Sequence, residues 1–267
     1  MPAAKQNWSD KISSSGSGKP TRAIFHGVEG VGKTSLPAYA AKPIYMMSKG
    51  ETGLTTLIDN KQIPEIPHFP EVMDWNDALS QIDWLTTSQH DHKTLVMDTL
   101  NGFERLCHEF VCARDFNNTW GKNGFTSYMQ GYEVALADWR ILLNALDRLR
   151  DAKGMSIICL CHTKVSTFKN PEGPDYDRYQ PDMHAKTWSL THKWADFVAF
   201  INFETFTEKD GARVKGKGGQ QRIMYTERHA AYDAKNRLGL PSEIVLADSA
   251  EASWNTLFNA MKEARTK

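Results

Sequence analysis

The feature that most limits what this 267-residue chain can fold into is the run Gly27-Val28-Glu29-Gly30-Val31-Gly32-Lys33-Thr34. It has the form G-x-x-x-x-G-K-[ST] and stands between an apolar run, expected to be a strand, and a segment expected to be a helix. Glycines let successive main-chain N–H groups turn inward around phosphates, and a helix N-terminus adds partial positive charge. We therefore expect this phosphate loop and the following Ser35 to bind a nucleotide, with Lys33 on the β- and γ-phosphates and Thr34 on Mg²⁺.

Short apolar runs alternate with segments of helical periodicity along the rest of the chain. Parallel strands that are buried on both faces have this appearance, and each helix then crosses back over the sheet. The pattern predicts an α/β fold with a mostly parallel central sheet flanked by helices, and antiparallel strands toward the C-terminal part. The expected strands are residues 22–27, 43–48, 65–69, 93–98, 155–161, 196–203 and 222–227. The expected helices are residues 33–41, 74–88 with Asp74 as N-cap, 99–115, 132–152 and 252–264.

Composition sets further bounds. The chain has 32 Lys and Arg and 32 Asp and Glu residues, so its zero formal charge excludes a uniformly basic nucleic-acid coat but allows a local basic patch. No stretch approaches the roughly 18 apolar residues that span a bilayer, so we expect a soluble cytoplasmic protein with no membrane partner. Residues 1–20 are polar and rich in Ser and Gly, which predicts a flexible lead before a single domain over residues 21–267. The cysteines are expected to be buried thiols in a reducing compartment: Cys107, Cys112, Cys159 and Cys161.

Polar residues follow three of the expected strands. Asp98 ends an apolar strand, as the acid of a Walker B strand does, and would hold Mg²⁺ beside Thr34, although an Asp here can also simply cap a helix. Glu51 and His162 follow two other strands, and the carboxyl ends of parallel strands meet at one ligand crevice. We expect Glu51 to orient or deprotonate the attacking water and His162 to hydrogen-bond the γ-phosphate as a sensor. Glu29 competes with Glu51 as the base, and ordinary solvated side chains are the alternative for Glu51 and His162.

With these features in this order, residues 21–244 resemble the RecA-like branch of P-loop ATPases. Within that branch the chain is similar to phage-encoded core-only recombinases, the RecA-like single-strand annealing proteins. The most specific element is Tyr232-Asp233-Ala234-Lys235-Asn236-Arg237-Leu238-Gly239-Leu240-Pro241, which is similar to the Lys-Asn-Arg-Phe-Gly motif of bacterial RadA with Leu238 in place of Phe. The resemblance implies ATP and Mg²⁺ as cofactors, a bacterial host cell as the location, and Lys235 and Arg237 reaching the ATP of a neighbouring subunit. A surface turn with exposed cations is the alternative for that motif.

Two segments in which basic and aromatic residues interleave, 117–131 and 163–188, are expected to be loops. The loops at these positions bind DNA in RecA-like recombinases, so the resemblance implies single-stranded DNA as a partner. Cations track phosphates, and rings stack on bases for about 1–3 kcal/mol each. The second segment also carries four acids, so a lid or packing loop remains the alternative. The Lys- and Gly-rich residues 209–222 would form a hairpin tip on the nucleic-acid backbone or a solvated turn. The expected DNA contacts are Trp120, Lys122 and Phe125 in the first segment, and Lys164, Phe168, Lys169, Arg178, Lys186 and Trp188 in the second.

These expectations favour a DNA-dependent ATPase that assembles on single-stranded DNA, as a filament or a ring with ATP between subunits, and promotes annealing or recombination. A single-strand-binding protein is a candidate partner. Three alternatives stay open: a ring-forming helicase or helicase loader of the same fold, a P-loop kinase for a small molecule, and a nucleotide-gated scaffold with negligible turnover.

Overall fold

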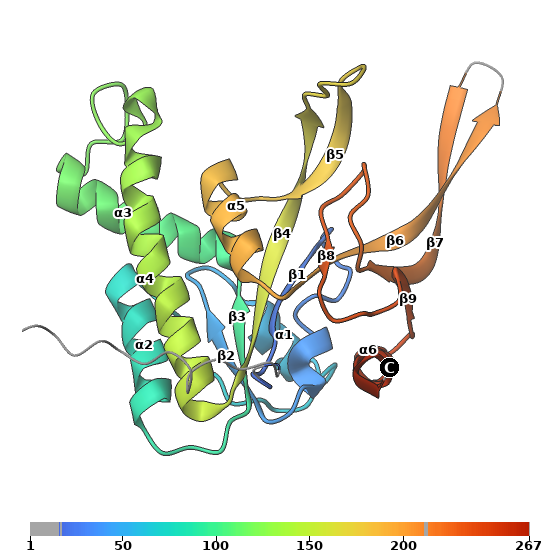
Figure 1. The fold of residues 1–267 in the computed structure, drawn as a ribbon, viewed down its shortest axis with the longest axis horizontal. Coiled ribbons are helices and arrows are strands. Elements are labelled where there is room, and N and C mark those ends of the chain that lie inside the picture. Colours follow the sequence, from blue (N-terminus) through green and yellow to red (C-terminus); the bar gives the residue numbers. More distant parts are fainter. Residues whose placement is uncertain (1–15, 17, 211–212, 267) are drawn as a thin grey trace, which may run out of the picture.

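The computed structural model describes residue 16, residues 18–210 and residues 213–266. Most of the expected N-terminal lead, residues 1–15 and 17, therefore lies outside the described residues. The described chain is organised around one sheet with the strand order β2-β3-β4-β1-β6-β7-β9, while β5 pairs with β4 and β8 pairs with β6 (Figure 1).

The sheet is parallel at its centre and antiparallel at one side. The parallel strands, in spatial order, are β2 (Pro43–Met47), β3 (Thr94–Asp98), β4 (Ser156–Phe168), β1 (Arg22–Gly27) and β6 (Phe197–Asp210). The antiparallel strands are β5 (Tyr176–Pro181), β7 (Arg213–Tyr225), β8 (Lys235–Asn236) and β9 (Glu243–Leu246). The predicted fold class is thus confirmed, and the buried central strands explain why the sequence runs there are continuously apolar.

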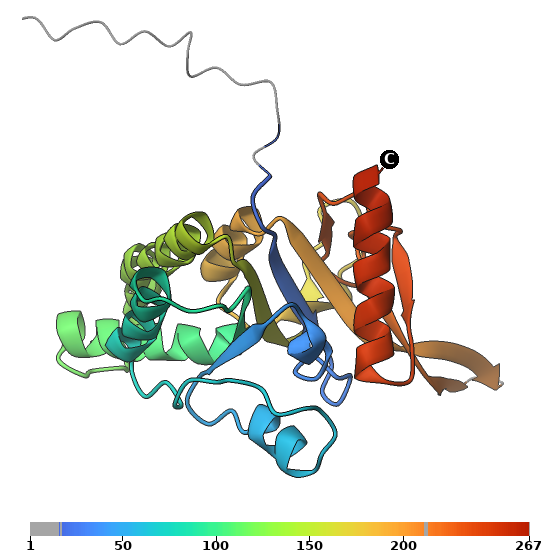
Figure 2. The same cartoon turned by 90° about the horizontal axis from the view of Figure 1, so that it is seen from below.

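Helices cover both faces of the sheet (Figure 2). Side chains of β1 alternate between the two cores: Ile24 packs on one face and Phe25 on the other. The Ile24 face is covered by α2 (Trp75–Thr87), α3 (Leu100–Phe116), α4 (Gln130–Lys153) and α5 (Ala185–Trp194). The Phe25 face is covered by the 3₁₀ helix η2 (Leu36–Tyr39), α1 (Gly53–Asp59) and α6 (Ala250–Thr266). A second 3₁₀ helix, η3 (Ser127–Met129), precedes α4.

Several local expectations are settled by the structure. Asp74 caps α2 as expected, since its Oδ1 accepts a hydrogen bond of 2.9 Å from the main-chain nitrogen of Asp77. All four cysteines are free and buried, as expected. The helix expected over residues 33–41 is wrong: a turn leads only into η2, because Pro37 has no N–H to donate and Pro43 already opens β2. The strand expected over residues 65–69 is also wrong, since only one bridge, between Tyr45 and His68, joins this segment to β2.

The loop expected over residues 163–188 is wrong as well. β4 continues to Phe168 and pairs with β5, and α5 follows directly. Cross-strand hydrogen bonds support the hairpin, including one of 2.9 Å from Ser166 Oγ to Gln180 Oε1. Both faces of this projecting hairpin are partly exposed to solvent over much of its length, so its residues are polar. A polar sequence without an apolar alternation is also typical of a loop, which explains the wrong prediction.

The expected turn region of residues 209–222 belongs largely to the paired strands β6 and β7. Residues 211 and 212, together with the side chains of residues 205–218, lie outside the description, so the expected backbone contact of this hairpin stays a prediction. No helix among the described residues is long and apolar enough to cross a bilayer.

The register of the sheet gathers the candidate residues at its carboxyl edge. Gly27 at the end of β1 lies opposite His162 of β4, and Asp98 at the end of β3 lies opposite Met47 of β2. The phosphate loop, Asp98 and His162 therefore lie at the same edge of the sheet, where the carboxyl ends of parallel strands meet.

Candidate nucleotide site and nucleic-acid surface

The phosphate loop leaves β1 in the middle of the sheet. Gly30 and Gly32 have φ angles of +73° and +87°, which lie in the left-handed region that favours glycine. Lys33 is buried, and its Nζ donates hydrogen bonds of 2.8 Å to the Gly27 carbonyl and 2.7 Å to the Val28 carbonyl. Burial lowers the pKa of this ammonium. The cation is thus held inside the loop, where the oxygens of a phosphate would be stronger acceptors than these carbonyls.

Tyr45 of β2 fixes the exit of the loop. Its side chain is fully buried, and its Oη donates a hydrogen bond of 2.7 Å to the main-chain oxygen of Thr34. Sequence reasoning missed this residue because a tyrosine inside an apolar strand looks like ordinary core.

Thr34 and Asp98, the pair expected to hold Mg²⁺, are in direct contact. Thr34 Oγ1 donates a hydrogen bond of 2.8 Å to Asp98 Oδ2, and Asp98 is 3% exposed. Burial raises the pKa of Asp98 to about 6. A hydroxyl and a carboxylate at contact distance fit Mg²⁺, which prefers oxygen ligands and takes the remainder from water and phosphates. No cluster of three or more His, Cys, Asp or Glu side chains that could hold a metal occurs among the described residues.

Glu51, His162 and Thr99 meet beside the metal pair. Glu51 Oε1 accepts a hydrogen bond of 3.0 Å from Thr99 Oγ1 and lies 3.4 Å from His162 Nε2. The hydrogen bond from His162 lowers the pKa of Glu51, and the same contact raises the pKa of His162. The Nδ1 atom of His162 is buried without a hydrogen-bond partner in the described chain. Glu51 and His162, the expected base and the expected sensor, are therefore neighbours joined by one hydrogen bond.

Two residues of this cluster were not identified from the sequence. Thr99 anchors Glu51, and Asn101 Oδ1 accepts a hydrogen bond of 3.2 Å from the main-chain nitrogen of His162. Both residues follow Asp98 within three positions. Because the strand that ends at Asp98 ends at the crevice, polar residues directly after it could have been predicted to lie in the site.

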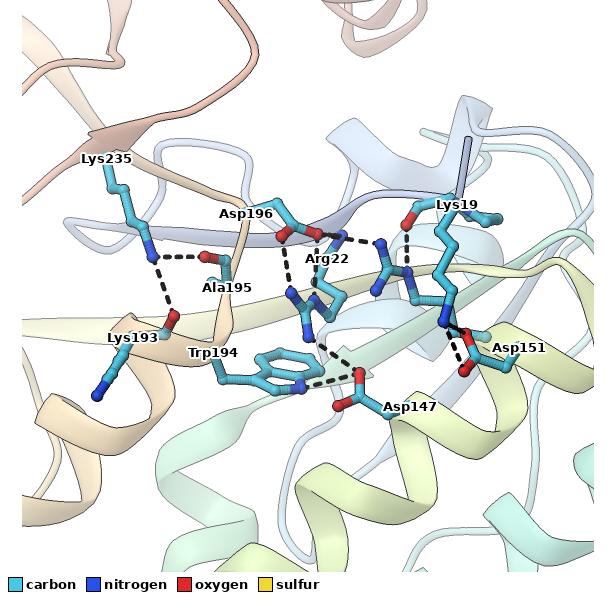
Figure 3. A network of polar contacts seen from close by, with 11 residues as sticks. Lys19, Arg22, Asp147, Asp151, Lys193, Trp194, Ala195, Asp196 and Lys235 are labelled. Atoms are coloured by element: carbon cyan, nitrogen blue, oxygen red, sulfur yellow. Dashed lines mark hydrogen bonds and ion pairs between the residues drawn. The ribbon is translucent and has the colours of Figure 1, made fainter. Parts of the chain in front are cut away.

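Lys235 has a different environment from the one expected. Its Nζ donates hydrogen bonds of 2.7, 3.2 and 2.6 Å to the carbonyls of His192, Lys193 and Ala195, at the C-terminal end of α5. Figure 3 shows the contacts with Lys193 and Ala195. All three of its protons are used within the chain, and a cation here also matches the negative end of the helix dipole. The structure therefore contradicts the expectation that Lys235 is free to reach a neighbouring subunit.

Arg237 remains available. It is exposed and makes no hydrogen bond or ion pair with another described residue. The preceding strand β8 pairs with Phe197 and Val198 at the start of β6, whereas the phosphate loop lies beside Ile201. Lys235, opposite Val198, therefore lies about 10 Å along the sheet from the chain's own phosphate loop, by the rise of three strand residues.

The edge of the sheet near Lys235 is held by ion pairs. Arg22 lies 2.8 Å from Asp196 and 3.1 Å from Asp147, and Trp194 Nε1 donates a hydrogen bond to the same Asp147 carboxylate (Figure 3). These contacts join β1, α4 and the start of β6. Lys235 is thus part of a structural network at the amino edge.

In the connection between α3 and α4, two of the expected DNA-contacting residues are exposed and the third is buried. Trp120 is 41% exposed, and Lys122 is exposed. Phe125 is fully buried, with its ring centre 5.0 Å from those of Trp120 and Tyr132. The expectation that Phe125 contacts DNA is therefore wrong for this structure, because its ring is the core of the connection.

The β4–β5 hairpin and α5 use most of their cations internally. Arg178 is 4% exposed and pairs with Asp233, which also accepts a hydrogen bond of 3.1 Å from Trp188 Nε1. Arg178 also lies over the half-buried ring of Phe168. These contacts contradict the expectation that Arg178 and Trp188 are free for DNA. The remaining expected cations are exposed but ion-paired: Lys164 with Asp182, Lys169 with Asp175, and Lys186 with Glu133.

A cavity of about 420 Å³ lies away from this site. It is enclosed by α6 and the first residues of the central strands, including Ala23, Thr94 and Ser156. Because the phosphate loop is at the opposite ends of these strands, the cavity does not mark the nucleotide site.

Comparisons with known proteins give a family, and the solved structures that match include a recombinase. The model of the AAA domain family matches residues 19–238. A crystal structure of the RadB recombinase superposes with a TM-score of 0.48 at 12% identity, covering 88% of this chain and 90% of that chain. No curated protein sequence matches the chain.

Proposed function

Because the chain belongs to the AAA domain family of P-loop ATPases, we propose that it hydrolyses ATP with Mg²⁺ and acts on single-stranded DNA in annealing or recombination. The observation that carries the proposal is the group at the carboxyl edge of the sheet. A carboxylate, Glu51, contacts there a protonatable histidine and Thr99, the residue that follows Asp98 of the Thr34–Asp98 pair. An anion-binding loop alone would serve binding, whereas a positioned carboxylate beside it serves hydrolysis.

Glu51 is the proposed general base. The hydrogen bond from His162 lowers its pKa, so the carboxylate is ionised at neutral pH and can accept a proton from water. Thr99 restrains the carboxylate to one orientation. Lys33 donates to phosphate oxygens, and Mg²⁺ bound at Thr34 and Asp98 would neutralise charge on the transferring group.

His162 links the site to the β4–β5 hairpin. It stands within β4, whose later residues form that hairpin. A γ-phosphate would compete with Glu51 for the proton on His162, so the presence of ATP changes the contacts of a residue on the hairpin strand. This connection supports the proposed sensor role.

DNA contact is proposed first for the connection between α3 and α4. Together with the two hairpins, this connection extends from the same edge of the sheet (Figure 1). Residues 117–131 contain Lys122 and no acidic residue, and Trp120 offers an exposed ring. By contrast, the exposed cations of the β4–β5 hairpin are already paired with carboxylates.

Assembly is proposed through Arg237 alone. A guanidinium that is exposed and unpaired within the described chain suits a phosphate of a second subunit, whereas Lys235 is occupied at the end of α5. ATP would then lie between neighbouring copies and stabilise a filament or a ring.

The proposal is tested by phosphate release from Mg-ATP, measured with and without oligothymidylate. We expect single-stranded DNA to stimulate turnover of the wild type and not to stimulate turnover of the Trp120→Ala variant. Trp84→Ala is the matched control, because Trp84 is 46% exposed on α2, outside the proposed surface. Turnover that ignores DNA in the wild type would contradict the DNA role, and electron microscopy with an ATP analogue would separate filament, ring and monomer.

A further inference from the structure

A second arginine lies against the phosphate loop. Arg222 comes from β7, and its Nη1 donates a hydrogen bond of 3.4 Å to the main-chain oxygen of Val31. A Cβ atom placed on Gly32 would lie 2.8 Å from the same Nη1, so the guanidinium packs directly on the loop at its last glycine. Arg222 is half-buried in this position.

The other end of the same guanidinium is anchored at the turn between β9 and α6. Arg222 Nη2 donates to the carbonyl of Ala247 and, at 3.0 Å, to the carbonyl of Asp248. It also lies 3.5 Å from Oγ of the fully buried Ser253. The planar fork of arginine can hold two such groups at once, which an ammonium on a flexible stem does less well.

Among the described side chains, no carboxylate pairs with this cation. Every hydrogen-bond acceptor of Arg222 is a carbonyl or a hydroxyl oxygen, and none of the described Asp or Glu side chains lies within ion-pair distance of it. Arg22 and Arg178, by contrast, are paired with aspartates. An uncompensated positive charge beside the loop raises the local potential for anions.

The hydrogen bond to Val31 also orients the loop. In a trans peptide unit the C=O and the following N–H point in opposite directions, and the bond between Val31 and Gly32 is trans. Holding the Val31 oxygen toward Arg222 therefore turns the Gly32 N–H away from β7. A backbone donor directed in this way is what a loop of this kind presents to a phosphate.

We propose that Arg222 is a positioning residue of the nucleotide site. Its guanidinium bridges the phosphate loop to the β9–α6 turn, keeps the Gly32 N–H available to a phosphate oxygen, and adds positive charge. The inference rests on the proposed function, since it assumes that the loop binds a nucleotide. It extends the site to the C-terminal helix, beyond the residues that the family model matches.

Calorimetric binding of Mg-ATP and of inorganic tripolyphosphate tests the inference with Arg222→Gln and Arg222→Lys. We expect both variants to bind both ligands about tenfold more weakly than the wild type, because the change acts on phosphate recognition and not on the base. In turnover assays KM should rise while kcat changes less than threefold. Arg140→Gln, at an exposed arginine of α4, is the control and should bind like the wild type.

The outcomes separate the inference from the proposed function. If the wild type binds neither ligand, the proposed nucleotide site itself is wrong. If the wild type binds and both Arg222 variants bind within twofold of it, the inference is overturned. Full recovery by Lys alone would overturn the bridging role, since charge would then suffice. If the variants unfold at a lower temperature but bind with unchanged affinity, Arg222 has a structural role only and the inference is overturned. If Arg222→Gln does not fold, the binding of Arg222→Lys decides between these outcomes.

Discussion

Replacing Asp98 by Asn should stabilise the protein while destroying its metal site. Asp98 is 3% exposed, and burial raises its pKa from 3.8 to about 6. A carboxyl group with a raised pKa is disfavoured as an ion in the folded state, so it lowers the free energy of unfolding at neutral pH. Asn keeps the shape and can still accept the hydrogen bond from Thr34, but it carries no charge.

The expected gain in the free energy of unfolding follows from the pKa shift of Asp98. A change from 3.8 to about 6 corresponds to about 3 kcal/mol at about 1.4 kcal/mol for each pKa unit. The penalty on the wild type is complete above pH 6, declines as the pH falls from about 6 toward 4, and is absent below. The Asn variant should therefore be more stable by up to about 3 kcal/mol at pH 7.5, and the difference should vanish near pH 4.

Urea unfolding in the presence of a chelator measures this difference at several pH values. Carboxylates that do not interact with Asp98 cancel between the two proteins, whereas its charged neighbours Glu51, His162 and Lys33 do not. Asp138→Asn is the matched control. Asp138 is 4% exposed but accepts hydrogen bonds of 2.8 and 2.9 Å from the half-exposed Arg114, so losing its charge should destabilise by about 1 kcal/mol.

Two results would refute the reasoning. An Asp98→Asn variant less stable than the wild type at pH 7.5 would show that the carboxylate is favourably solvated or paired in the fold. A stability difference that persists unchanged at pH 4 would show that charge is not its cause. Mg²⁺ with nucleotide should raise the unfolding midpoint of the wild type and leave that of the variant unchanged.

Four further substitutions test the site and its surroundings. Glu51→Gln should lower ATP hydrolysis about 10²–10⁴-fold with binding retained, and the His162 titration followed by NMR should move to lower pH because its anionic partner is lost; unchanged hydrolysis would favour a binding scaffold. Lys33→Ala should abolish ATP binding in calorimetry with an unchanged circular dichroism spectrum, and full ATPase activity would disprove the central site. Trp120→Ala should weaken single-strand binding by about 1–3 kcal/mol in fluorescence titrations without altering basal turnover; equal binding removes it from the surface. Arg237→Ala should reduce assembly and hydrolysis together in sedimentation and turnover assays, and an assembling, active variant excludes a role between subunits.

The nucleotide side of the molecule was predictable because its determinants are local. A strand that ends in Gly27 and a strand that ends in Asp98 are each visible as apolar runs. Both pair in parallel with β4, which lies between them, so their carboxyl ends meet at one edge of the sheet. The contact between Thr34 and Asp98 follows from these two facts.

The residues of the proposed nucleic-acid surface were predicted less well, because their burial depends on distant partners. In the sequence Arg178 and Lys235 both look like free cations. In the structure Arg178 pairs with Asp233, and Lys235 donates to carbonyls at the end of α5. Phe125 has polar and glycine neighbours in the sequence, yet rings from α3 and α4 enclose it. No local pattern carries these pairings, since they join segments far apart in the chain.

The brevity of η2 has a consequence for how a triphosphate is held. A long helix after such a loop would contribute many aligned peptide dipoles, whereas here the chain turns into a four-residue 3₁₀ helix and then enters β2. Attraction must then come mainly from discrete cations, foremost Lys33. Dissolved ions damp the long-range attraction of a triphosphate toward these cations, with a Debye length of about 10 Å at 0.1 M and about 3 Å at 1 M, but they screen a direct contact with the buried Lys33 much less. Added salt should therefore slow the capture of nucleotide more than it speeds its release, which ties the rate at which this protein reloads to the salt content of its surroundings.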